Sequence, residues 1–158
     1  MMKEAAVVTL NKLMALCSKA EKCELDAFNY MTSHGCSEQE AALGVEYLVE
    51  NKYVDNRRYA ESFFSDKLRF LKWGRKKIVS RLRLKKISPD DINYVLEVFS
   101  DVEDEKKIMK DELAKKLRGI KEGLPKRKVW EKLMRFCLSR GYDVGISSNV
   151  IDGLLKDY

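Results

Sequence analysis

Lysine and arginine side chains gather in one segment of the sequence, at a spacing that could bind anions. Residues 57–87 carry twelve basic and two acidic residues, a local charge of +10. Within this segment Lys77, Arg81 and Lys85 follow one another at four-residue steps, which places them on one side of a helix. Like charges at that spacing repel one another, and an anionic partner would remove the repulsion. The pattern favours binding of nucleic acid or an acidic protein face over a merely solvated helix surface.

A second basic face is predicted on the helix that precedes this one, over about residues 56–73. Its expected apolar stripe consists of Ala60, Phe64, Leu68 and Leu71, and basic side chains occupy the opposite side. Trp73, beside Lys72 and Gly74 at the helix end, could stack on unpaired bases, whereas most other aromatic residues of this segment fall at core-facing positions. The residues that we expect to contact a partner or DNA are Arg58, Arg69, Lys72, Arg75, Lys76, Lys77, Arg81 and Lys85.

Residue types that perform catalysis or bind metal are sparse and scattered. The four cysteines, Cys17, Cys23, Cys36 and Cys137, form no C-x-x-C pair, and His34 is the only histidine. We therefore expect free thiols and no metal site. The eight glycines form no phosphate-binding loop, and His34 has no evident nucleophile or carboxylate companion. We predict no catalytic residues, no cofactor and no enzymatic activity.

Length and composition favour a folded protein outside the membrane. The 158 residues are 45% hydrophobic and 35% charged, with a net charge of +6, so the chain can bury a real core. No apolar run approaches the ~20 residues of a membrane-spanning helix, and the N-terminus lacks the pattern of a secretory signal. We expect a cytoplasmic protein with no membrane partner.

Apolar residues recur at three- and four-residue steps, which predicts an all-α fold. Ser37 with Glu40 forms a capping box, Asp55 and Ser88 are expected N-caps, and the acidic run 101–105 suits a helix start. The expected helices cover about residues 4–17, 24–34, 56–73, 75–84, 102–118 and 126–140, and three more are expected to start at about residues 37, 88 and 146.

The helices repeat along the sequence. A helix–turn–helix pattern recurs three times, with turns at Gly35, Lys86 and Gly141, and equivalent apolar positions precede each turn. We expect three tandem three-helix repeats that form an elongated, curved monomer. Their expected bounds are residues 1–52, 53–100 and 101–158, and the second repeat is strongly basic.

Three segments resemble the signatures of the RecX family. Residues 53–63, Tyr-Val-Asp-Asn-Arg-Arg-Tyr-Ala-Glu-Ser-Phe, are similar to its most characteristic stretch, in which an Asp-rich turn precedes Arg-(Phe/Tyr)-Ala. Gly-Arg-Lys-Lys-Ile at 74–78 and Arg-Phe-x-x-x-Arg-Gly-Tyr at 135–142 resemble its second- and third-repeat motifs. The motif residues with an expected structural role are Tyr53, Asp55, Tyr59, Gly74 and Gly141.

The resemblance implies both a fold and a function. It implies three three-helix repeats and a negative regulator of homologous recombination and the SOS response. Such a protein binds the RecA recombinase and its filament on single-stranded DNA, and double-stranded DNA is a further candidate partner. It inhibits the ATPase, strand-exchange and coprotease activities of RecA. The basic faces would then meet DNA phosphates or acidic recombinase surfaces, in the filament groove or at its growing end.

The chain departs from the family pattern at a few positions, and two other functions stay open. Lys86 stands where glycine is common, which should strain that turn, and Cys23 replaces a usual serine cap, which should weaken one helix start. The charge pattern is equally compatible with a nucleic-acid-binding helical protein that has no recombinase partner. It also fits a helical scaffold that docks acidic proteins.

Overall fold

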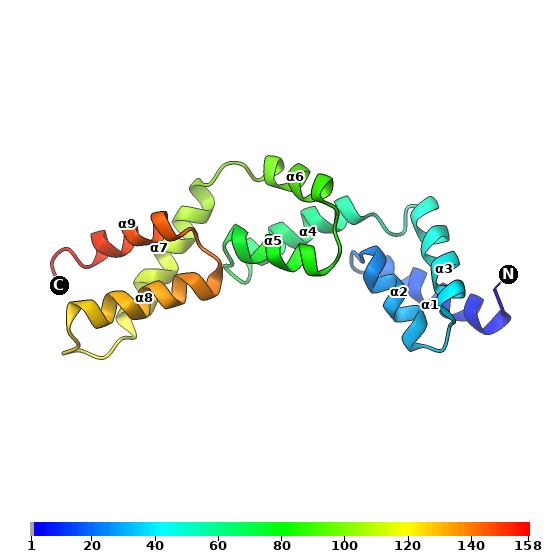
Figure 1. Ribbon diagram of the computed structural model, residues 1–158, viewed down its shortest axis with the longest axis horizontal. Helices are drawn as coiled ribbons and strands as arrows, with labels where there is room; N and C mark the ends of the chain where they lie inside the picture. Colours follow the sequence, from blue (N-terminus) through cyan, green and yellow to red (C-terminus); the bar gives the residue numbers. More distant parts are fainter. Residues whose placement is uncertain (1) are drawn as a thin grey trace. The chain divides into compact units, whose positions relative to one another are not determined.

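The computed structural model describes residues 2–158, which form α-helices and no strand. The all-α prediction is confirmed. The helices are α1 (Glu4–Cys17), α2 (Glu24–Ser33), α3 (Glu38–Glu50), α4 (Asn56–Arg69), α5 (Arg75–Leu84), α6 (Pro89–Val98), α7 (Glu103–Arg118), α8 (Lys126–Arg140) and α9 (Val144–Leu154), as labelled in Figure 1. None of these helices combines the length and apolar character needed to cross a lipid bilayer.

The nine helices of residues 2–158 form three successive three-helix repeats, α1–α3, α4–α6 and α7–α9. In each repeat the turn between the last two helices has one residue in the left-handed conformation: Gly35 (φ 92°), Lys86 (φ 58°) and Gly141 (φ 81°). The next backbone N–H donates to the carbonyl five residues earlier. These bonds are Cys36 to Met31 (3.0 Å), Ile87 to Leu82 (3.1 Å) and Tyr142 to Cys137 (3.1 Å). The shared turn geometry matches the repeat predicted from spacing, and Lys86 carries the expected strain of a side chain at positive φ.

The helices are divided by contacts into two compact units. Unit 1 comprises Met1–Ser62 and Leu82–Val95. In it α1, α2 and α3 pack against one another around a buried cluster of aliphatic and small side chains. That cluster consists of Leu10, Leu13, Ala27, Met31, Ala41, Leu48 and Val54.

Unit 2 comprises Phe63–Arg81 and Leu96–Tyr158. Helices α7, α8 and α9 pack mutually, and the partly buried Trp130 packs against their core. The buried members of this core are Met109, Leu113, Val129, Leu133, Met134, Cys137, Tyr142, Ile151 and Leu155. The unit also contains the basic α4–α5 connection, which the third repeat holds in place.

The predicted helix caps are present. Ser37 and Glu40 form the capping box, and the Asp55 carboxylate accepts a hydrogen bond from the Arg58 backbone N–H at 3.0 Å. Ser88 Oγ accepts from the Asp91 N–H at 3.2 Å. The expected weakness at Cys23 is offset, because its Sγ accepts from the Asp26 N–H at 3.4 Å.

Two helix ends differ from the prediction. Helix α4 stops at Arg69, four residues before the expected end, and Lys72 adopts a φ of 59°. Leu71, expected in the core stripe, is therefore 45% exposed and lies in the connection after the helix. Helix α9 starts at Val144, earlier than expected, because the side chain of Asp143 caps it.

Candidate nucleic-acid interface

Three cations surround one aromatic ring in unit 2. The Lys77 ammonium lies 4.4 Å from the centre of the Trp73 ring, Lys67 Nζ lies 5.4 Å from it, and the Arg81 guanidinium carbon lies 5.8 Å from it. We call Lys67, Trp73, Lys77 and Arg81 the Trp73 cluster. Each cation is attracted to the ring face, and their mutual repulsion remains. The arrangement offers an aromatic surface and several positive charges together, which is what a nucleic-acid strand binds.

Burial and like charge act on Lys77 together. Its ammonium donates to the Ser139 carbonyl oxygen at 3.1 Å. Desolvation lowers the pKa of Lys77, and the neighbouring positive charges of Arg81 and Arg140 lower it further. A phosphate or carboxylate that approached this group would relieve the crowding of positive charge.

Four predicted cations of unit 2 fall into two groups: three are exposed and one is half-buried. Arg69, Lys76 and Arg81 are exposed, and Lys76 Nζ lies 4.0 Å from Asp143 Oδ2. Lys72 turns back onto the chain and donates to the Arg69 carbonyl oxygen at 2.5 Å. The predicted outer face of α4 therefore ends at Arg69, because Lys72 lies beyond the helix.

Arg75 is a structural residue in unit 2. Its Nε donates to Glu105 Oε2 at 2.7 Å, and its Nη2 donates to the Phe99 carbonyl oxygen at 2.9 Å. The side chains of Arg75 and Glu105 are only 24% and 11% exposed. A pair this enclosed is screened little by solvent, so it fixes the position where α5 begins.

The third repeat caps the N-terminus of α5. The first free backbone N–H groups of that helix need acceptors. Arg75 N–H donates to Glu105 Oε1 at 2.9 Å, and Lys76 N–H donates to the Gly141 carbonyl at 3.3 Å. Gly74 N–H, one residue earlier, donates to the Arg140 carbonyl at 2.7 Å. The direction of α5 thus depends on the turn between α8 and α9.

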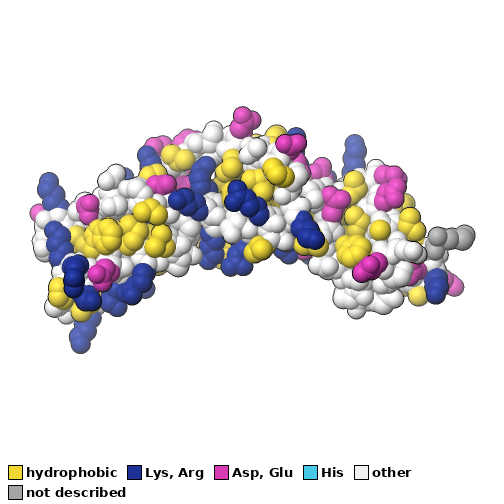
Figure 2. All heavy atoms as spheres, viewed as in Figure 1, with side chains coloured by type: hydrophobic (Ala, Val, Ile, Leu, Met, Phe, Trp, Pro, Cys, Tyr) yellow, Lys and Arg dark blue, Asp and Glu magenta, His cyan; other side chains and the backbone are white. Residues whose placement is uncertain are grey.

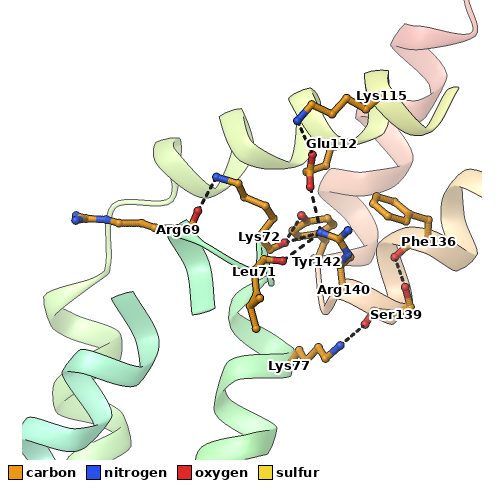
Figure 3. Close-up of polar contacts among 10 residues, drawn as sticks. All are labelled: Arg69, Leu71, Lys72, Lys77, Glu112, Lys115, Phe136, Ser139, Arg140 and Tyr142. Atoms are coloured by element: carbon orange, nitrogen blue, oxygen red, sulfur yellow. Dashed lines mark hydrogen bonds and ion pairs between the residues drawn. The ribbon is translucent and has the colours of Figure 1, made fainter. Parts of the chain in front are cut away.

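Arg140 and Tyr142 hold the connection between α4 and α5 (Figure 3). Arg140 Nη1 donates to the Leu71 carbonyl at 3.3 Å and to Glu112 Oε1 at 3.2 Å. The Tyr142 hydroxyl donates to the Lys72 carbonyl. Tyr142 is buried, and burial raises its pKa to about 12, so the hydroxyl keeps the proton that it donates. These contacts fix the backbone on which Trp73 is carried.

Two motif glycines allow this close approach. A side chain on Gly74 would place Cβ 2.4 Å from the Gly141 carbonyl oxygen. A side chain on Gly141 would place Cβ 2.4 Å from the Lys77 backbone nitrogen, at a residue whose φ is already 81°. Both positions therefore exclude larger residues.

Arg58 and Lys85, the other two predicted contact residues, lie in unit 1. Arg58 Nε contacts both carboxylate oxygens of Glu21 at 2.8 and 2.9 Å, and its Nη2 donates to the Lys52 carbonyl at 3.1 Å. Lys85 Nζ contacts Asp26 Oδ1 at 2.7 Å, and this bond raises the pKa of Lys85. Both cations are already neutralised inside the unit. Their contact with a partner stays a prediction.

The tyrosines of the main motif are buried or half-buried. Tyr59 is buried, and burial raises the pKa of its hydroxyl. Tyr53 is half-buried beside the first core, and its carbonyl accepts from Arg58 Nη2 at 3.3 Å. All four cysteines are free thiols, and no group of three or more metal-ligating side chains occurs within residues 2–158.

Several residues of this site were missed by the sequence analysis. Lys67 was not predicted as a contact residue, because a helix assumed to continue to Trp73 directs the two side chains differently. Glu105 was assigned only to a helix start, and no local pattern connects it with Arg75, thirty positions away. Arg140 belongs to a quoted motif, but its target in the α4–α5 connection is visible only in the fold.

Comparison with known proteins connects this fold to one family of regulators. Residues 55–96 match the family described as RecX, second three-helix domain. A regulatory protein RecX from Staphylococcus aureus (strain Newman) is 27% identical over 139 residues, which cover 87% of this chain and 49% of that protein. The equivalent protein of strain JH9 gives the same values. The chain thus spans about half the length of the curated relatives that it matches.

Solved structures show the same architecture. A crystal structure of regulatory protein RecX matches with a TM-score of 0.80 and 19% identity, over 98% of this chain and 74% of that one. RecX from Lactobacillus salivarius matches with a TM-score of 0.74 and 16% identity, over 97% and 98%. The chain therefore has the fold of these two RecX structures. It is related to the RecX regulatory proteins, and the resemblance predicted from its motifs is confirmed.

Proposed function

We propose that this protein is a non-catalytic regulator of homologous recombination and the SOS response that acts in the cytoplasm on the RecA recombinase. It binds the recombinase filament on single-stranded DNA and lowers its ATPase, strand-exchange and coprotease activities. The relationship to RecX supports the class of regulator. That its partners are RecA and DNA is the further part of the proposal.

The Trp73 cluster is the observation that carries the proposal. Cations crowd an aromatic ring there, and exposed Arg69 and Lys76 extend the positive surface. Phosphates of single-stranded DNA or acidic groups of the recombinase would neutralise this charge. Arg75 acts as a positioning residue, because Glu105 and the Phe99 carbonyl already occupy its guanidinium.

DNA-dependent ATP hydrolysis by the recombinase tests the proposal. The protein is titrated into filaments already formed on single-stranded DNA. We expect hydrolysis to fall with the wild-type chain, and to fall much less with an Arg69→Glu, Arg81→Glu double variant. Within residues 2–158 neither side chain forms an ion pair with a carboxylate, so the variant should keep its helicity.

A matched control distinguishes the effect of charge at Arg69 and Arg81 from the effect of net charge. Lys12→Glu with Lys19→Glu makes the same change in net charge at two exposed lysines of the first repeat. We expect this control to inhibit like the wild-type chain. Equal inhibition by all three proteins would show that Arg69 and Arg81 are not contact residues.

The ratio at which inhibition occurs distinguishes two mechanisms. Inhibition well below one protein per recombinase monomer favours binding at filament ends, whereas inhibition near equal ratios favours binding along the groove. A folded wild-type chain without any effect would contradict the proposal. A mobility shift with bare single-stranded DNA at two salt concentrations would then separate a general nucleic-acid-binding protein from a scaffold for acidic proteins.

A further inference from the structure

The third repeat contains a basic pocket, and none of the predicted contact residues lines it. It has a volume of about 570 Å³ and lies between the end of α7, the α7–α8 connection and α8. Five cations line it and no carboxylate does: Lys115, Lys116, Lys121, Lys132 and Arg135. In Figure 2 Lys and Arg side chains gather at the lower left, over the end of the molecule where Figure 1 shows α7 and α8.

Two of these cations have structural partners. Lys115 contacts Glu112 Oε2 at 3.5 Å, and Lys116 lies 5.7 Å from the centre of the Phe136 ring. Both also lie in the last turn of α7, where positive charge is stabilised by the helix dipole. Folding alone therefore accounts for Lys115 and Lys116.

The other three cations have no such explanation. Lys121, Lys132 and Arg135 are exposed, and within residues 2–158 none of them is paired with a carboxylate. Lys132 and Arg135 are three positions apart on α8, so their charges repel one another. Three unpaired positive charges line one pocket, which favours binding of an anionic ligand.

We propose that this pocket binds phosphodiester groups of a single-stranded nucleic acid. Its volume is within the range of small-ligand sites and suits one nucleotide unit of a chain. Ile120, Leu124 and Phe136 supply an apolar wall against which an unstacked base can pack. A duplex presents its phosphates on a rigid convex surface that cannot enter a hollow, whereas a single strand is flexible enough to do so.

The pocket is separate from the Trp73 cluster, and its proposed ligand does not require a recombinase. Binding of bare DNA therefore tests the pocket proposal. A negative result would contradict this proposal without contradicting the proposed function. The probe is a dye-labelled oligothymidine, and the readout is fluorescence anisotropy over a series of salt concentrations.

The test variant is Lys132→Glu with Arg135→Glu. Loss of two phosphate contacts on a single strand makes the negative slope of log K against log salt shallower by about 1.4, which corresponds to about 25-fold weaker binding at one-tenth molar salt. The matched control is Lys126→Glu with Arg127→Glu. These exposed residues at the start of α8 project away from the pocket-lining side and give the same change in net charge. We expect the control to retain most of the affinity and the wild-type salt slope.

Three outcomes would overturn the proposal. The first is equal loss of affinity in the test and control variants, which would indicate only long-range attraction. The second is displacement of the oligonucleotide by a nucleoside triphosphate at similar concentration, which would assign the pocket to free nucleotides. The third is equal displacement by polyglutamate of the same charge, which would assign it to acidic protein. If the charge-reversed variant loses helicity, Lys132→Gln with Arg135→Gln replaces it and should show the same reduction in slope.

Discussion

Replacing Glu105 by glutamine tests whether the third repeat holds the beginning of α5. The carboxylate accepts two hydrogen bonds from Arg75, one from the backbone N–H at 2.9 Å and one from Nε at 2.7 Å. Glutamine has nearly the same shape but only one acceptor oxygen and no charge. One of the two bonds is therefore lost, and an amide N–H₂ group faces a donor of Arg75.

The expected cost follows from burial and from the remaining partners. A hydrogen bond to a charged group contributes about 1.5–3 kcal/mol, and removing one partner of a fully buried ion pair costs about 3–5 kcal/mol. The Arg75 side chain is 24% exposed and keeps its bond to the Phe99 carbonyl, which reduces that cost. We expect Glu105→Gln to lower the free energy of unfolding by about 2 kcal/mol.

Urea unfolding followed by far-ultraviolet circular dichroism measures this loss. Glu103→Gln is the matched control, because Glu103 is also in the first turn of α7 but is exposed, with only a 3.5 Å contact to Lys106. The control should cost less than about 0.5 kcal/mol. A similarly small loss for Glu105→Gln would refute the assignment. So would a coupling energy near zero in a double-mutant cycle with Arg75→Met, for which we expect about 1–2 kcal/mol.

Two further predictions concern unit 1. Asp55→Ala removes the acceptor of the Arg58 N–H and should cost about 1 kcal/mol in urea unfolding. A loss of recombinase inhibition by this variant, when fully folded, would instead indicate direct contact. Burial raises the pKa of Cys23 from 9.0 to about 11, so the unfolded thiol loses its proton first and stability should fall as pH rises through that interval. Cys23→Ser keeps a capping oxygen and should make the fall in stability shallower, and an unchanged pH profile would contradict this assignment.

Local patterns predicted much of the fold because helices and their ends are determined by nearby residues. The capping box at Ser37, the cap at Asp55 and the left-handed turns at Gly35 and Gly141 depend on side chains within a few positions. The predicted end of α4 was wrong because it too was inferred from nearby residues alone. No glycine or proline lies between Asn56 and Gly74, so the apolar spacing appeared to continue the helix to Trp73.

The candidate site depends on contacts that local patterns do not contain. Arg58 and Arg75 looked like free basic residues in the sequence, yet Glu21 and Glu105 neutralise them from 37 and 30 positions away. The positive charge of residues 106–140 is evident from composition, but only the packing of α7 and α8 turns part of it into a pocket. Sequence indicates how much charge a segment carries, whereas the fold determines which charges remain available to a ligand.

The charges in the first turn of α5 support the proposal of an anionic partner. The N-terminus of a helix carries partial positive charge, so acidic residues stabilise it and basic residues destabilise it. This helix has no acidic residue in its first turn and begins with Arg75, Lys76 and Lys77. Glu105 compensates for Arg75, but Lys76 has only a distant contact and the pKa of Lys77 is lowered by burial and neighbouring cations. A sequence optimised for stability alone would place acids here. The presence of three cations at this end is explained if phosphates or carboxylates of a partner supply the missing negative charge when the complex forms.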